Sequence, residues 1–291
     1  MGSTLAWLLP ALGAFFHYGV GQGLVKKYAD SVPPARFCFF LVLAKSVVNL
    51  GFFAVEGSAV PLGDPASLPF LAVGFLAYFL DGAAWVLYFE SVVCGPITIV
   101  GTLSAAYPAF TVLFARLFLA EALLPWQYVG VALLVLGCVG LSYSPADPSA
   151  GTQSRRWIPL AATALVLWGG AQTLVKYAYG LPHADEAGLA VLNTLGGMAS
   201  LGLYGWFKTP RHGLFKRFAA SFVPMALMAV GDLLVIVASR RGPISLVTPI
   251  SGAYPLVTVG FAYVFLNERL NALQWLCVLS VLAGMTLGSS S

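Results

Sequence analysis

The chain has 291 residues, of which 59% are hydrophobic and only 9% are charged, and its mean hydropathy is +0.87. Soluble globular domains carry about 25% charged residues, so this composition excludes an ordinary soluble domain and indicates a membrane protein. The formal net charge of +4 is small and is spread over short connecting segments, which argues against a nucleic-acid-binding surface.

Apolar runs of about 20 residues, the length that spans a bilayer as a helix, fill nearly the whole chain. Divided at polar residues and at Gly and Pro, they predict ten transmembrane helices at 5–25, 35–55, 68–93, 96–119, 124–143, 157–178, 187–206, 218–239, 243–266 and 271–288. The N-terminal run lacks the basic segment and cleavage site of a signal peptide, so we expect the first helix to be retained. The four cysteines show no paired spacing, and we expect no metal site and no cofactor.

One long stretch of the sequence occurs twice. The segment that begins GPITIVGTLSAAYPAF at Gly95 aligns without a gap with the segment that begins GPISLVTPISGAYPLV at Gly242. A second match places YGVGQGLVK at 18–26 over WGGAQTLVK at 168–176. A repeat unit of about half the chain indicates a duplicated protein and not a solenoid.

The segment SPADPSAGTQSRR at 144–156 has the composition of a linker. We therefore expect a first five-helix repeat at 1–143, the linker at 144–156, and a second five-helix repeat at 157–291. Because each half has an odd number of spans, the second half must enter the membrane from the opposite side. The predicted fold is thus an all-α membrane protein with ten transmembrane helices in two inverted repeats, an arrangement typical of secondary transporters.

Four features recur in the same order in both halves. They are GPI, then Tyr-Pro (Tyr107-Pro108 and Tyr254-Pro255), then Phe-Leu-x-Glu (ending at Glu121 and Glu268), then Gln127 and Gln274. On these motifs the chain resembles the drug/metabolite transporter superfamily, and in particular its ten-helix members with two EamA-type domains. A basic residue, Arg269, follows the motif glutamate only in the second half, where the first half has Ala122.

The resemblance implies transport of a small metabolite, because similar proteins export amino acids, sugars, nucleotide-linked compounds or drugs, and a few import metabolites. It also implies that both termini lie in the cytoplasm. The Lys and Arg residues of the loops favour the opposite orientation by the positive-inside rule, so the orientation stays open. No GxxxxGK[ST] phosphate loop occurs in the sequence, which argues against direct ATP drive.

Pro108 and Pro255 interrupt the fourth and ninth predicted helices at matching points. A proline removes one backbone hydrogen bond inside a helix, and a membrane tolerates such a break where a polar cavity satisfies the freed carbonyl. We predict that the two prolines act as hinges beside a central cavity, with Tyr107 and Tyr254 as substrate-binding candidates. The alternative is a pair of ordinary packing kinks.

Ionisable side chains within predicted spans are costly and therefore suggest function. Asp81, Trp85 and Tyr88 follow one another at helical spacing, so a carboxylate and two aromatic rings share one helix face. Such a face suits a cationic or zwitterionic substrate, because aromatic rings attract ammonium groups. The other candidates within predicted spans are His17, Lys45, Glu90 and Asp232.

These other ionisable residues leave alternatives open. Lys45 could bind a substrate carboxylate or pair with an aspartate inside the protein. Asp81, Asp232 and His17 are candidates for proton coupling, although His17 could instead be a hydrogen-bonded packing residue. Glu90 lies near a helix end, where an interfacial charge is the simpler interpretation.

Gln22 and Gln172 occupy matching places in the two halves, each one turn after an aromatic residue, Tyr18 or Trp168. Gln22, Gln172 and Trp168 are substrate-binding candidates, and the alternative for the glutamines is interhelical hydrogen bonding. Glu121 and Glu268 precede the fifth and tenth helices, where capping or packing of the turn explains them. The helices at 124–143 and 271–288 carry small residues and no charge, which is consistent with scaffold helices or with a homodimer contact.

The sequence thus predicts a secondary transporter that moves an amino acid or a related zwitterionic or cationic solute by alternating access. Its partners would be that solute and the lipid bilayer, with no nucleic acid, and its location the bacterial inner membrane. An exporter or importer of a sugar, a nucleotide-linked compound or a phosphorylated metabolite is the main alternative. A remote one is an intramembrane aspartyl enzyme in which Asp81 and Asp232 share a proton, although we expect no enzymatic activity.

Overall fold

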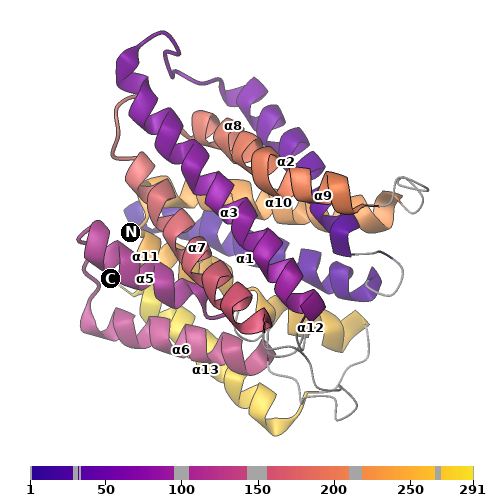
Figure 1. Cartoon of the computed structure of the whole chain (residues 1–291). Helices are drawn as coiled ribbons and strands as arrows, with labels where there is room; N and C mark the ends of the chain where they lie inside the picture. The colour runs from indigo at the N-terminus through magenta and orange to yellow at the C-terminus, as the bar shows by residue number, and fades with distance from the viewer. Residues whose placement is uncertain are drawn as a thin grey trace.

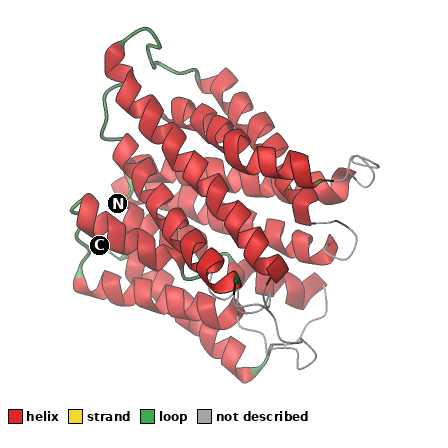
Figure 2. Cartoon of the chain, viewed as in Figure 1, coloured by secondary structure: helices red, strands yellow, loops and turns green. Residues whose placement is uncertain are grey.

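The structure, a computed structural model, describes residues 2–28, 32, 34–94, 105–142, 156–209, 218–265 and 270–290. Within these ranges the chain consists of helices joined by short loops, with no strand (Figure 2). The predicted linker at 144–156 lies outside the described residues except for Arg156, and so does Glu268.

The helices follow the predicted spans closely. The first half contains α1 (Gly2–Tyr28), α2 (Pro34–Glu56), the short 3-10 helix η1 (Pro65–Ser67), α3 (Leu68–Cys94), α5 (Tyr107–Phe118) and α6 (Pro125–Ser142). The second contains α7 (Trp157–Ala178), α8 (Glu186–Gly197), the π-helix η2 (Met198–Gly202), α9 (Leu203–Lys208), α10 (Phe218–Arg241), α11 (Ile244–Gly252), α12 (Pro255–Phe265) and α13 (Ala272–Ser289). Among the described residues, eight helical segments are long and apolar enough to cross a membrane, and two shorter apolar helices bring the set to ten. The predicted all-α membrane fold is confirmed.

Two predicted spans differ from the observed helices. The span at 243–266 is broken in two, because α11 ends at Gly252 and α12 begins at Pro255 after a turn at Ala253 and Tyr254. The break follows from the proline, which has no N–H to donate back into the preceding turn. The span at 96–119 is described only from residue 105, and its helix α5 likewise begins at a Tyr-Pro pair.

Equivalent helices of the two halves make equivalent packing contacts. Helix α1 packs on α10 as α7 packs on α3, and α1 contacts α12 as α7 contacts α5, while α2 contacts α8 and α6 contacts α13. Trp7, near the start of α1, packs against Gly242, and Lys176, near the end of α7, donates a 2.8 Å hydrogen bond to the Gly242 carbonyl. Counterpart helices α1 and α7 therefore run in opposite directions, as an inverted repeat requires.

Both termini lie at the same end of the bundle (Figure 1), which we call the terminal end. Here two acidic side chains link the halves. Asp185 accepts 2.8 Å hydrogen bonds from the Ser58 hydroxyl and the Ala59 amide. Glu121 accepts hydrogen bonds from the backbone amides of Ile244 and Ser245 at 3.1 and 3.0 Å. Glu121 therefore caps the start of α11 in the other half, a longer-range role than the local turn predicted from sequence.

Helices α6 and α13 approach so closely that glycine is required at their contact. A Cβ atom on Gly284 would lie 2.6 Å from the carbonyl oxygen of Gly130, and one on Gly130 would lie 2.8 Å from the amide nitrogen of Gly288. Real Cβ atoms essentially never come this close to backbone atoms. The small residues of these helices thus serve a contact within the chain, and the homodimer through the same helices stays a prediction.

Candidate functional site

A cavity lies in the middle of the helix bundle. The space open to the centre of a water molecule is about 80 Å³, and one water needs roughly 10–15 Å³ by that measure. The cavity therefore has room for several waters or for a small organic solute. It is lined by Tyr18, Gln22, Asp81, Trp85, Tyr88, Tyr107, Trp168, Gln172, Met228, Asp232 and Tyr254.

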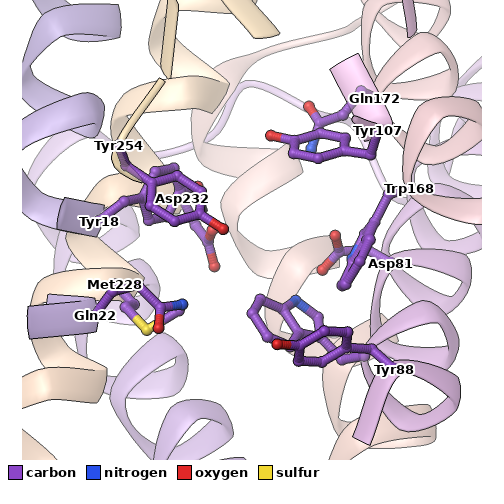
Figure 3. Close-up of a pocket in the computed structure, with 11 residues that line it drawn as sticks. Tyr18, Gln22, Asp81, Tyr88, Tyr107, Trp168, Gln172, Met228, Asp232 and Tyr254 are labelled. Atoms are coloured by element: carbon purple, nitrogen blue, oxygen red, sulfur yellow. Dashed lines mark hydrogen bonds between the residues drawn. The ribbon is translucent and has the colours of Figure 1, made fainter. Parts of the chain in front are cut away.

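Two walls face each other across this cavity (Figure 3). Helices α1 and α10 and the turn before α12 supply Tyr18, Gln22, Met228, Asp232 and Tyr254 to one wall. Helices α3, α5 and α7 supply Asp81, Tyr88, Tyr107, Trp168 and Gln172 to the other. Each wall combines helices from both halves, so the cavity lies at the interface of the two repeats, where inverted-repeat transporters bind their substrates.

Lys45 joins the carboxylates of the two walls. Its ammonium nitrogen lies 2.9 Å from Asp232 Oδ2 and 3.4 Å from Asp81 Oδ2. Lys45 comes from α2, Asp81 from α3 and Asp232 from α10, so these ion pairs connect three helices and both halves. We refer to Lys45, Asp81 and Asp232 as the ion triad.

The ion triad presents negative charge to the cavity. The Lys45 side chain is only 2% exposed and is not among the lining residues, whereas Asp81 and Asp232 are 14% and 24% exposed and do line the cavity. With all three groups charged, two carboxylates face one ammonium, which leaves one negative charge uncompensated. The internal pairing considered for Lys45 is present, and Lys45 itself is not among the residues that line the cavity.

Aromatic rings line the same wall of the cavity as Asp81. Trp85 and Tyr88 follow it at helical spacing on α3, and the Trp168 ring of α7 lies 5.2 Å from Trp85 and 5.6 Å from Tyr88 between ring centroids. Tyr107 adds a further ring 5.9 Å from Trp168. The face predicted from sequence thus becomes one side of an aromatic enclosure, which favours an organic cation over an inorganic one.

The interrupted helices place the two matching tyrosines at the cavity. Tyr254 lies in the turn before Pro255, and Tyr107 begins α5 directly before Pro108. The two breaks also meet, because Gly252 at the end of α11 packs against the ring of Pro108 and the hydroxyl of Tyr107. The hinge role of both prolines stays a prediction.

Gln22 and Gln172 line opposite walls, as their matching positions in the repeat lead one to expect. The side-chain oxygen of Gln172 is buried and has no hydrogen-bond partner among the described residues. Buried polar atoms are normally hydrogen-bonded. This oxygen is therefore available to accept a hydrogen bond from a solute or from water.

Not every candidate residue lines the cavity. Nδ1 of His17 lies 2.8 Å from the carbonyl of Gly13 one turn earlier, and His17 is absent from the lining of the cavity described above. Glu90 pairs with Lys208 at 3.7 Å and is not among the lining residues. Met228 does line the cavity, and it could not be predicted from the sequence because nothing distinguishes one apolar residue of α10 from its neighbours.

In the part of the chain that the structure describes, no group of three His, Cys, Asp or Glu side chains could hold a metal ion.

Comparison with known proteins supplies the family. The EamA-like transporter family matches residues 5–143 and again residues 155–290. No curated protein sequence matches the chain. One solved structure, described as "Crystal structure of protein", is 17% identical, with a TM-score of 0.76 over 96% of this chain and 94% of that chain, and this likeness shows the fold. Since the two family matches together cover nearly the whole sequence, the chain belongs to the EamA-like transporter family of the drug/metabolite transporter superfamily and is an integral membrane transporter of small molecules.

Proposed function

We propose that the protein is a secondary carrier for a small organic solute that bears an ammonium group, either an amine or an amino acid or related zwitterion. The observation that carries this proposal is the composition of the cavity. Two carboxylates and six aromatic rings line it, and none of its eleven lining residues is Lys, Arg or His. One ammonium group would neutralise the excess charge of the ion triad, and the rings would surround it.

The same charge balance ranks the alternatives. A phosphorylated or nucleotide-linked solute would bring further negative charge next to Asp81 and Asp232, and like charges at short range in a site of low dielectric repel strongly. An amino acid would leave its own carboxylate to the amides and tyrosine hydroxyls of the cavity. The site therefore favours an amine over a zwitterion, and a zwitterion over an anion.

We also propose that the carrier exchanges protons at this site. When no solute is bound, a proton on Asp81 or Asp232 neutralises the same charge that a solute ammonium would neutralise. Solute and proton would then compete for one site, and an opposing proton gradient would drive the solute across. His17 takes no part in this scheme, because it is hydrogen-bonded within α1 and does not line the cavity.

An intramembrane aspartyl enzyme finds less support. Such an enzyme needs two carboxylates that share a proton, whereas Asp81 and Asp232 each pair with the Lys45 ammonium. We therefore propose a transport function without catalysis. The location in a bacterial inner membrane is part of the same proposal, and it rests on the sequence alone.

A thermal-shift screen of the detergent-purified protein tests the proposed function. The screen compares amines, amino acids, sugars, nucleotides and phosphorylated metabolites, because a ligand of the folded state raises its stability by about 2.7 kcal/mol at a hundredfold excess over its Kd. We expect shifts with amines and amino acids that are lost in Asp81→Asn. The matched control is Asp64→Asn, in a loop of the terminal end, which should keep them. A shift confined to anionic metabolites and unchanged in Asp81→Asn would contradict the proposal.

A further inference from the structure

A second group of buried polar side chains lies on α2 and α8, two helices that pack against each other beside Lys45. Asn49 of α2 and Asn193 and Thr194 of α8 are buried, at 0%, 1% and 4% exposure. The Asn49 amide donates a 3.2 Å hydrogen bond to the Thr194 hydroxyl, which in turn lies 3.4 Å from the backbone carbonyl of Lys45. We call Asn49, Asn193 and Thr194 the polar chamber. None of the three lines the cavity.

The polar chamber has unused hydrogen-bonding capacity. Oδ1 of Asn49 and both side-chain amide atoms of Asn193 are buried and have no partner among the described residues. Leaving a buried polar group without a hydrogen-bond partner is energetically costly. Because both amide atoms of Asn193 lack partners, turning its amide group over would not remove this cost. The chamber is therefore built for a polar group that does not occupy it in the present conformation.

Open space adjoins the chamber beside the Lys45 stem. Gly197, at the end of α8, is buried, yet a Cβ atom built on it would meet nothing closer than Lys45 Cδ at 4.0 Å. The next turn of the same segment is the π-helix η2, and such turns occur frequently at functional sites. A space large enough for a methyl group therefore lies beside the Lys45 stem.

The geometry of α2 places the chamber within reach of Lys45. Lys45 and Asn49 are four residues apart on one helix, so they share a face and their side chains can meet. A lysine side chain has a flexible four-carbon stem and three N–H donors. The free oxygens of Asn49 and Asn193 are acceptors of the kind that an ammonium group needs.

We propose that Lys45 is a tethered counter-ion, which holds the place of the solute ammonium at Asp81 and Asp232 and moves into the polar chamber when a cationic solute binds. This inference rests on the proposed function, and it adds the exchange step. A solute ammonium cannot take both carboxylates while the Lys45 ammonium occupies them. The chamber offers the displaced ammonium two oxygen acceptors. The ammonium can therefore leave the carboxylates and still remain in the membrane interior.

The test is to fill the space that Lys45 needs. In Gly197→Ala an added methyl group meets no clash, so the protein should fold, but the movement of the lysine stem is obstructed. We expect Kd for phenethylamine, a probe with one ammonium and one ring, to rise about tenfold by isothermal titration calorimetry, as for one lost hydrogen bond to a charged group. The matched control is Gly51→Ala on the exposed side of α2, where nothing lies within 4 Å of the added atom; its Kd should not change.

A variant without the Lys45 ammonium distinguishes an effect on the displacement of Lys45 from a general disturbance of the binding site. In Lys45→Met no ammonium has to move, so adding Gly197→Ala should leave the phenethylamine Kd unchanged. If Lys45→Met does not fold, Lys45→Gln, which is also uncharged but can donate hydrogen bonds to the carboxylates, takes its place. Equal weakening with and without Lys45, or no weakening in either, would overturn the tethered counter-ion but not the proposed function. A folded wild-type protein that binds none of the amines and amino acids of the thermal-shift screen would overturn both.

Discussion

The hydroxyl of Tyr18 donates a 2.5 Å hydrogen bond to Oδ1 of Asp232 and so joins α1 of the first half to α10 of the second at the wall of the cavity. The other oxygen of Asp232 pairs with Lys45. One carboxylate therefore receives a hydrogen bond from the first half on each of its oxygens. Its position depends on how the two halves fit together.

Replacing Tyr18 by Phe removes only the hydroxyl of this contact. Hydrogen bonds to charged groups contribute about 1.5–3 kcal/mol, so the melting temperature of the purified protein in detergent should fall. The exposed Tyr263 provides the control, because Tyr263→Phe removes the same atom at the surface. Equal melting temperatures for the two variants would show that the Tyr18 hydroxyl contributes nothing to stability.

Gln172→Leu should alter selectivity among amines. The buried Gln172 oxygen lacks a partner among the described residues, so it can accept a hydrogen bond from a primary ammonium but not from a quaternary one. We expect the Kd for phenethylamine to rise about tenfold, as for one lost hydrogen bond to a charged group, and the Kd for its N,N,N-trimethyl derivative to stay the same. Titration calorimetry with both ligands checks this, and a parallel loss for both would mean that Gln172 only shapes the wall.

Local patterns in the sequence predicted the fold and much of the cavity lining. Hydropathy and the repeat were sufficient for the ten spans and their inversion. Helical spacing placed Asp81, Trp85 and Tyr88 on one face, because three positions on one helix have a fixed relation whatever surrounds them. The matching positions of Gln22 and Gln172 likewise followed from the duplication.

What the sequence could not provide depends on which helices become neighbours. From the sequence, a solute carboxylate and an aspartate are equally reasonable partners for Lys45. The packing of α2 on α10 determines which one it meets. The capping of α11 by Glu121 joins residues more than 120 positions apart, and no local motif encodes that distance. The polar chamber was missed for the same reason, since Asn49 and Thr194 have no charge and meet only through packing of α2 on α8.

Glu121→Ala should destabilise the terminal end. The Glu121 side chain accepts hydrogen bonds from two amides at the start of α11 and from the Ser245 hydroxyl at 2.7 Å. Loss of a helix cap costs about 0.5–2 kcal/mol, so we expect a lower melting temperature. Glu56→Ala, at an exposed helix end, serves as the control. A Glu121→Ala protein that melts with the wild type would refute the capping role.

Gly284→Ala should separate α6 from α13. The added methyl group would lie 2.6 Å from the Gly130 carbonyl oxygen, and overpacking of this kind costs about 1–3 kcal/mol. Gly260→Ala is the matched control, since an added Cβ there has nothing within 4 Å. We expect only Gly284→Ala to lower the melting temperature; the same value for both variants would mean that the helices separate without cost.

The charge of the ion triad is proposed to select an ammonium-bearing solute. The most direct measurement is calorimetric titration of the wild-type protein and Asp81→Asn with phenethylamine, phenylalanine and 3-phenylpropionate, which share a ring and carry a cation, a zwitterion and an anion. We expect wild-type affinity to fall in that order and Asp81→Asn to lower the affinity for phenethylamine most. Tightest binding of 3-phenylpropionate, or equal binding of all three in both proteins, would contradict this proposal.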